Sequence, residues 1–160
     1  MKHVISFVLF TLALISNNSI AGFNQAPEIN LPGINGNVQL ESLRGKVIYL
    51  DFWASWCLPC KKSFPWMNKM KQNYADQGFE IVAINLDTER KLADEFLKEI
   101  DVNFIVAFDE SGQSASQYKL KGMPSSYLIG RDGKVYASHV GFRDKDKLQL
   151  EQTIKNLLNQ

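Results

Sequence analysis

The sequence has few cysteines and histidines, and its charges balance. Its 160 residues contain two cysteines and two histidines, and 18 Lys and Arg stand against 17 Asp and Glu. Balanced charge gives no reason to expect nucleic acid or an anionic membrane surface as a partner, because both require a basic face. The chain also has no internal repeat, long biased tract or visible interdomain linker. Its length therefore predicts one globular domain.

The one marked apolar run, from Val4 to Ile15, lies near the N-terminus and is too short to span a bilayer comfortably. It follows Met1-Lys2-His3 and precedes a polar segment that ends in Ser19-Ile20-Ala21. A positive start, an apolar middle and a small-residue end are typical of a secretory signal peptide. We expect residues 1–21 to be the signal peptide and residues 22–160 the exported domain. An uncleaved anchor is the alternative, and no cysteine lies near the cleavage point to carry a lipid.

Hydrophobic patterns predict an α/β domain. We expect strands at 38–40, 46–53, 79–86, 104–108, 125–129 and 134–140, and helices at 58–74, 91–99, 114–120 and 144–158. The first strand is expected in an edge hairpin, and Asp132-Gly133 marks a second hairpin. Asp87-Thr88-Glu89 is interpreted as a helix cap. Leu148 and Leu157 are among the expected apolar positions of the last helix. This order favours a three-layer domain with a central mixed sheet and helices on both faces.

The two cysteines, Cys57 and Cys60, lie where a buried strand gives way to a helix. As a structural bridge they would close a loop of four residues and would stabilise the fold little. The N–H groups and dipole of a helix start stabilise a thiolate, so reactivity explains the pair better. We interpret Cys57, expected to be partly exposed, as the nucleophile and Cys60 as the thiol that resolves the mixed disulfide.

The segment from Asp51 to Lys61, Asp-Phe-Trp-Ala-Ser-Trp-Cys-Leu-Pro-Cys-Lys, resembles the active-site segment of the thioredoxin superfamily. Pro65 lies where those proteins have a helix-kinking proline, Gly122-Met123-Pro124-Ser125-Ser126 is similar to their cis-proline loop, and Gly141 also fits. Residues 26–158 are similar to the TlpA/ResA-like (DsbE-like) branch. The features that indicate this branch are the expected export, the added N-terminal β-hairpin, and the extra helix and strand after residues 84–87. The resemblance implies a thioredoxin-like fold and a redox-active Cys57–Cys60 disulfide, with no cofactor.

The resemblance also implies roles for other residues. Pro124 would be the cis-proline beside the disulfide, where it presents no N–H and leaves neighbouring backbone groups for a substrate strand, with Met123 flanking that groove. Asp51 would be the acid beneath Cys60, and burial would raise its pKa so that it can exchange a proton with that thiol. Trp56 and Pro59 complete the expected substrate-binding residues. Trp53 fits a core position as well as a functional one.

Members of this branch are typically extracytoplasmic and often reductive. The resemblance implies a periplasmic reductase of protein disulfides, including apocytochrome c, that receives electrons from a membrane donor of the DsbD/CcdA type. Contact with the membrane is expected only through a transient or uncleaved leader. The Leu58-Pro59 pair does not fix the direction of electron flow, so a disulfide oxidase or isomerase stays open.

Other classes of protein fit the residues less well. A copper-binding thioredoxin-like chaperone is one rival, with Cys57, Cys60 and His139 as ligands, but these three fall short of a complete zinc set. A cysteine hydrolase requires a base and an orienting group around one thiol. A peroxidase requires a threonine-containing motif ahead of Cys57, and a silent binding module has no use for two thiols. We expect no resident metal.

Overall fold

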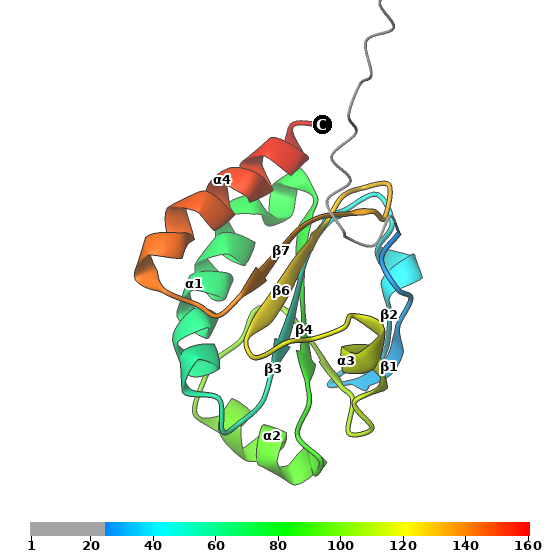
Figure 1. Cartoon of the computed structure of the whole chain (residues 1–160), viewed down its shortest axis with the longest axis vertical. Coiled ribbons are helices and arrows are strands. Elements are labelled where there is room, and N and C mark those ends of the chain that lie inside the picture. The colour runs from blue at the N-terminus through cyan, green and yellow to red at the C-terminus, as the bar shows by residue number, and fades with distance from the viewer. Residues whose placement is uncertain (1–24) are drawn as a thin grey trace, which may run out of the picture.

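The computed structural model describes residues 25–160, so the expected signal peptide lies outside the described residues. Seven strands form one sheet in the order β2-β1-β5-β4-β3-β6-β7 (Figure 1). The strands are β1 Asn30–Gly33, β2 Gly36–Gln39, β3 Val47–Trp53, β4 Phe79–Asn85, β5 Ile105–Phe108, β6 Ser125–Ile129 and β7 Val135–Val140. The helices are α1 Leu58–Tyr74, α2 Arg90–Lys98, α3 Gln113–Gln117 and α4 Lys147–Leu158, with short 3-10 turns at Leu40–Leu43, Ala75–Gln77 and Asp144–Asp146.

The sheet is mixed, as predicted. Strands β3, β4 and β5 run parallel, whereas β6 is antiparallel to β3 and β7 is antiparallel to β6. The hairpin of β1 and β2 joins the edge of β5 through the pair Gly33 and Ala107, which confirms the added N-terminal hairpin. All seven residues of β3 are buried, because this strand lies in the middle of the sheet and is covered on both faces.

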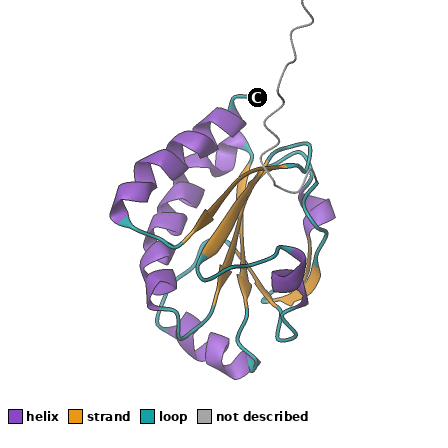
Figure 2. Ribbon diagram, in the orientation of Figure 1, coloured by secondary structure: helices purple, strands orange, loops and turns teal. Residues whose placement is uncertain are grey.

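Helices cover both faces of the sheet, which confirms the three-layer prediction (Figure 2). Alternate residues of β3 point to opposite faces. Tyr49 and Trp53 join a core cluster with apolar side chains of α1, α2 and α4. Phe52 joins a second cluster with Tyr118, which follows α3, and with Leu40. Within residues 25–160, no helix is both long and apolar enough to cross a bilayer.

Two local predictions are wrong. Leu148 is 81% exposed, because the chain first makes the 3-10 turn at Asp144–Asp146 and α4 begins only at Lys147, so Leu148 lies on the outer side of its first turn. Leu150 is buried on the inner side instead. Residues 87–89 do not cap α2 through a side chain: Glu89 occupies the N-cap position without such a bond. Asp87 has other partners, which belong to the site.

Candidate active site

The N-terminus of α1 carries Cys57 as its N-cap residue. The Sγ atom of Cys57 accepts the N–H of Cys60 at 3.3 Å, while its carbonyl oxygen accepts the N–H groups of Cys60 and Lys61 at 3.1 and 3.2 Å. A side-chain acceptor at this position satisfies an amide that has no partner inside the helix. Pro59 stands exposed in the first turn of α1, where its missing N–H costs nothing. The sequence thus places a sulfur atom at the positive end of a long helix.

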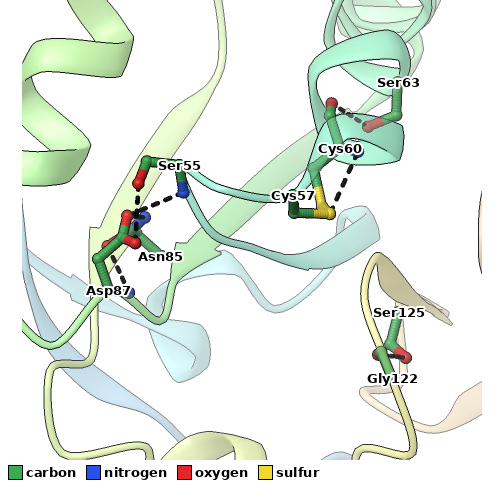
Figure 3. The surroundings of a disulfide bond; sticks show 8 residues. All are labelled: Ser55, Cys57, Cys60, Ser63, Asn85, Asp87, Gly122 and Ser125. Carbon is green, nitrogen blue, oxygen red and sulfur yellow. Dashed lines mark hydrogen bonds between the residues drawn. A yellow bond between two sulfur atoms is a disulfide. The ribbon is translucent and has the colours of Figure 1, made fainter.

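Cys57 and Cys60 form a disulfide, with their Cα atoms 5.3 Å apart (Figure 3). Cys57 is 5% exposed and Cys60 is fully buried. Cys57 is therefore less exposed than predicted, because both cysteines pack into the core cluster beneath α1 and Met123 contacts that cluster. The order of exposure nevertheless agrees with the assigned roles, since the outer sulfur is the one that an incoming thiolate or disulfide reaches first.

The turn before Cys57 is held by Asp87, which follows β4. One oxygen of its carboxylate accepts the N–H of Ser55 at 2.9 Å, and the other accepts the hydroxyl of Ser55 at 3.0 Å. Asn85 donates its amide to the same carboxylate at 2.7 Å and accepts the N–H of Asp87 at 3.0 Å. Figure 3 shows this cluster beside the segment that leads to Cys57. Sequence reasoning missed both supporting residues, although polar residues at the end of a buried strand are a signal for such a site.

Asp51 is 1% exposed in the middle of β3, as predicted for a buried acid. Its neighbours Tyr49 and Trp53 lie in the core cluster that contains both cysteines, so alternation along the strand directs Asp51 to this same face. Burial raises the pKa of Asp51 well above its ordinary value. Its Oδ2 atom has no hydrogen-bond partner among the described residues. A carboxyl with a raised pKa is a stronger base when ionised, which suits proton exchange with a thiol.

An open, mostly apolar groove of about 460 Å³ lies beside Trp56, the residue that precedes Cys57. It is lined by Trp56, Leu86, Ala115, Leu120, Gly122 and Met123. Trp56 is 68% exposed at the rim of this groove. Trp53 is buried and its ring packs against those of Phe64 and Phe96, so Trp53 is a core residue. The predicted substrate residues Trp56 and Met123 therefore share one surface.

The peptide bond between Met123 and Pro124 is cis, as the resemblance implies. The carbonyl oxygen of Pro124 accepts the N–H of Gly141 at 2.8 Å, which joins this loop to the end of β7. Gly141 has φ +85°, a conformation that favours glycine. Figure 3 shows the Gly122–Ser125 loop and the Ser55–Asp87 cluster on different sides of the disulfide. The residues of the loop thus approach the cysteines from the β6 side.

His139, the third ligand of the copper alternative, has a different neighbour. Its Nε2 atom lies 3.3 Å from Oδ2 of Asp146, at the start of α4. Within residues 25–160, no three His, Cys, Asp or Glu side chains come together as a group that could hold a metal ion. The structure does not bring His139 and the two cysteines into one ligand set.

A mixed sheet with helices on both faces, a disulfide at a strand-to-helix junction and a cis-proline loop beside it define a thioredoxin-like thiol-disulfide oxidoreductase. The AhpC/TSA family model matches residues 23–138, so the chain belongs to the AhpC/TSA family. The thiol-disulfide oxidoreductase ResA of Bacillus subtilis (strain 168) is 34% identical over 132 residues, which are 82% of this chain and 74% of that protein. Within the family, the chain is thus of the ResA-like type.

Solved structures agree. A crystal structure from Chlorobium tepidum, assigned as the thiol:disulfide interchange protein DsbE, is 51% identical with a TM-score of 0.85 and covers 88% of this chain and 99% of its own. A solution structure from Bacteroides thetaiotaomicron, assigned as a protein disulfide isomerase, is 28% identical with a TM-score of 0.78 and covers 87% of this chain and 94% of its own. The two names refer to thiol:disulfide interchange and to disulfide isomerisation.

Proposed function

We propose that the chain is exported to the periplasm and reduces protein disulfides there, with Cys57 as the attacking and Cys60 as the resolving thiol. The observation that carries the direction is the modest support of the Cys57 sulfur, which accepts one backbone N–H, from Cys60. No Lys, Arg or His lies between Ala54 and Cys60 to add a positive charge. Strong oxidants owe their high potential to a stabilised thiolate form. With the helix dipole and one backbone donor as its supports, the Cys57 thiolate is stabilised less than it would be beside a cation, which favours the disulfide form and thus a reductant.

A redox titration of the Cys57–Cys60 pair against glutathione tests the direction. We expect a potential nearer to about −270 mV than to about −120 mV. A value close to the upper figure would make the protein an oxidase and would overturn the proposal. The variant Cys60→Ser is the control, because it forms only a mixed disulfide with glutathione and loses the two-thiol transition.

The groove lined by Trp56 and Met123 is proposed to receive the apolar residues that flank a substrate disulfide. Burial of such residues contributes about 25 cal/mol for each Å² removed from water. We further propose that apocytochrome c is among the substrates and that a membrane donor of the DsbD/CcdA type re-reduces the pair. An oxidised Cys-x-x-Cys-His peptide, the haem attachment sequence, should be reduced faster than oxidised glutathione. Equal rates would contradict this substrate.

Export is proposed on the pattern of residues 1–21. The mass of protein recovered from the periplasm of a bacterial expression host tests it. We expect the mass of a chain that starts at Gly22. The mass of a chain that starts at Met1 would mean that the leader stays as an anchor.

A further inference from the structure

A row of polar side chains crosses three adjacent strands on the face of the sheet that α1 and α4 cover. Asp51 on β3 pairs with Ser126 on β6, and Ser126 pairs with His139 on β7. Leu128 and Ala137, two residues along from Ser126 and His139, contact the core cluster that contains side chains of α1 and α4, which fixes the face. Cross-strand partners have Cβ atoms about 4.5–5.5 Å apart. The three side chains are therefore consecutive neighbours.

The hydroxyl of Ser126 is the polar group that follows Asp51 in this row. Burial and, to a smaller extent, the charge of Asp51 raise the pKa of Tyr49, while the nearby hydroxyl of Ser126 lowers it. Ser126 is 4% exposed and Tyr49 is 2% exposed, so bulk water does not reach them. A hydroxyl donates one hydrogen bond while it accepts another. It can hand on a proton without becoming charged.

Beyond Ser126 a cavity of about 80 Å³ lies between the sheet and the start of α4. Its lining includes Ser126, His139, Asp146 and Thr153. The cavity exceeds the volume of a water molecule, and the hydroxyl of Ser126, the imidazole of His139 and the carboxylate of Asp146 supply the two to four polar partners that a buried water needs. The hydroxyl of Thr153 donates to the carbonyl oxygen of Gln149 at 2.9 Å instead. At the outer end of the cavity, Asp146 accepts a hydrogen bond from Arg143 at 2.7 Å. The side chain of Arg143 is 60% exposed. The cavity thus joins a buried hydroxyl to the surface.

We propose that Ser126, the water of this cavity and His139 form a proton path that connects the buried carboxyl of Asp51 with solvent, with His139 as the positioning residue at its outer end. The inference rests on the proposed role of Asp51 as the acid that exchanges a proton with Cys60. Imidazole is the side chain best suited to accept and release protons near neutral pH.

The chemistry needs such a path. The thiol of Cys60 gives its proton to the carboxylate of Asp51, and the thiolate attacks the Cys57 sulfur of the mixed disulfide. The Cys57–Cys60 bond forms, the bond to the substrate breaks, and the substrate sulfur leaves with the electron pair as a thiolate, which takes a proton from water. The two cysteines are oxidised and the substrate is reduced. Asp51 then passes its proton through Ser126 and the cavity water to His139 and on to solvent.

Charged and titratable groups face the path from several elements. His139 on β7 faces Asp146, which lies at the start of α4. Arg143, with smaller contributions from His139 and Lys145, holds the pKa of Asp146 below its usual value. Asp51 faces Tyr49 on its own strand, while its pairing partners on β4 and β6 are Ala83 and Ser126. From α1, the cysteines Cys57 and Cys60 face the same cluster.

Infrared spectroscopy after a pH jump tests the path directly, on the full oxidised domain. The carboxyl band that Asp51→Asn removes belongs to Asp51, and its decay measures release of that proton. We expect His139→Gln to slow the decay about tenfold in dilute buffer, and added imidazole to restore it. Thr153→Val is the matched control, since it lines the same cavity, keeps its shape and should decay at the wild-type rate.

Three results would overturn the path: an unchanged decay in His139→Gln, equal slowing in His139→Gln and Thr153→Val, or a slowed decay that imidazole does not restore. The role of Asp51 is tested separately with DTNB, which forms a mixed disulfide at Cys57 that Cys60 then resolves with release of a second thionitrobenzoate. Asp51→Asn should slow this release about 100-fold. An unchanged release would refute the role of Asp51, whatever the infrared decay shows.

Discussion

The backbone N–H of Ser55 donates a hydrogen bond to the carboxylate of Asp87 at 2.9 Å, across 32 positions of sequence. The hydroxyl of Ser55 donates to the second oxygen of the same group. These two bonds tie the turn between β3 and α1 to the loop after β4. Because Cys57 lies two residues after Ser55, these bonds restrain the backbone that positions its sulfur.

Asp87→Ala should therefore affect both stability and reactivity. It leaves the N–H of Ser55 and the buried amide of Asn85 without their acceptor, which costs about 1–3 kcal/mol for each buried group. We expect the free energy of unfolding in urea to fall by about 2–3 kcal/mol and the first reaction of Cys57 with DTNB to slow. Asp76→Ala, at an exposed site, should change neither quantity. A stable Asp87→Ala would show that the turn holds its shape without this carboxylate.

Asp51→Asn should be more stable than the wild type at and above neutral pH. Since burial raises the pKa of Asp51, the folded protein holds this proton more tightly than the unfolded chain does. That stabilisation is complete below the unfolded pKa of about 3.9 and is lost as the pH rises through the folded pKa. Within this window the wild type should lose about 1.4 kcal/mol per pH unit relative to the variant. Urea titrations at several pH values measure the difference, and parallel curves would contradict the assignment.

Trp56→Ala should separate recognition of a protein substrate from thiol chemistry. Trp56 is 68% exposed at the rim of the groove, so its loss removes contact area without disturbing the core. We expect KM for a protein disulfide to rise about tenfold and the DTNB reaction to stay within about twofold. Leu148→Ala removes an apolar side chain of 81% exposure on α4, outside the groove, and should alter neither. Equal slowing of both reactions in Trp56→Ala would place Trp56 in the thiol chemistry instead.

Lys71→Met should destabilise the fold more than loss of a surface ion pair does. Glu80 is 6% exposed on β4 and pairs with Lys71 at 2.7 Å and with Lys46 at 3.5 Å. Removing the nearer cation leaves a buried carboxylate with one weaker partner, at an expected cost of about 2–3 kcal/mol. Lys91→Met breaks an exposed pair with Glu95 and should cost less than about 0.5 kcal/mol. Urea unfolding of the two variants compares them, and similar losses would show that Lys46 alone neutralises Glu80.

Elements with local signals were predictable from the sequence. The bounds of α1 agree with the expected range because Cys57 and Pro59 mark its start and an apolar stripe with three- and four-residue spacing marks its length. β3 was equally clear, since a strand buried on both faces has an apolar composition that no amphipathic element shares. The site followed from these two elements, because the cysteines lie at their junction.

Contacts between distant segments were not predictable. The sequence neighbours of Asp87 predict a helix cap, whereas its actual partner, Ser55, becomes adjacent only when β3 and β4 pair. His139 is a possible metal ligand from the sequence for the same reason. Its place in line with Ser126 depends on the register of β6 and β7, which a single sequence does not encode locally.

Cys57 is both the N-cap of α1 and half of the redox pair, so oxidation or reduction of its sulfur also changes the group that caps the helix. Folding and oxidation of the pair form one thermodynamic cycle. Any excess in the unfolding free energy of the oxidised form over the reduced form must appear as a lower potential of the folded pair relative to the same two thiols in the unfolded chain. Two denaturation curves, one for each form, therefore determine how far the fold displaces the potential, with no redox partner in the cuvette.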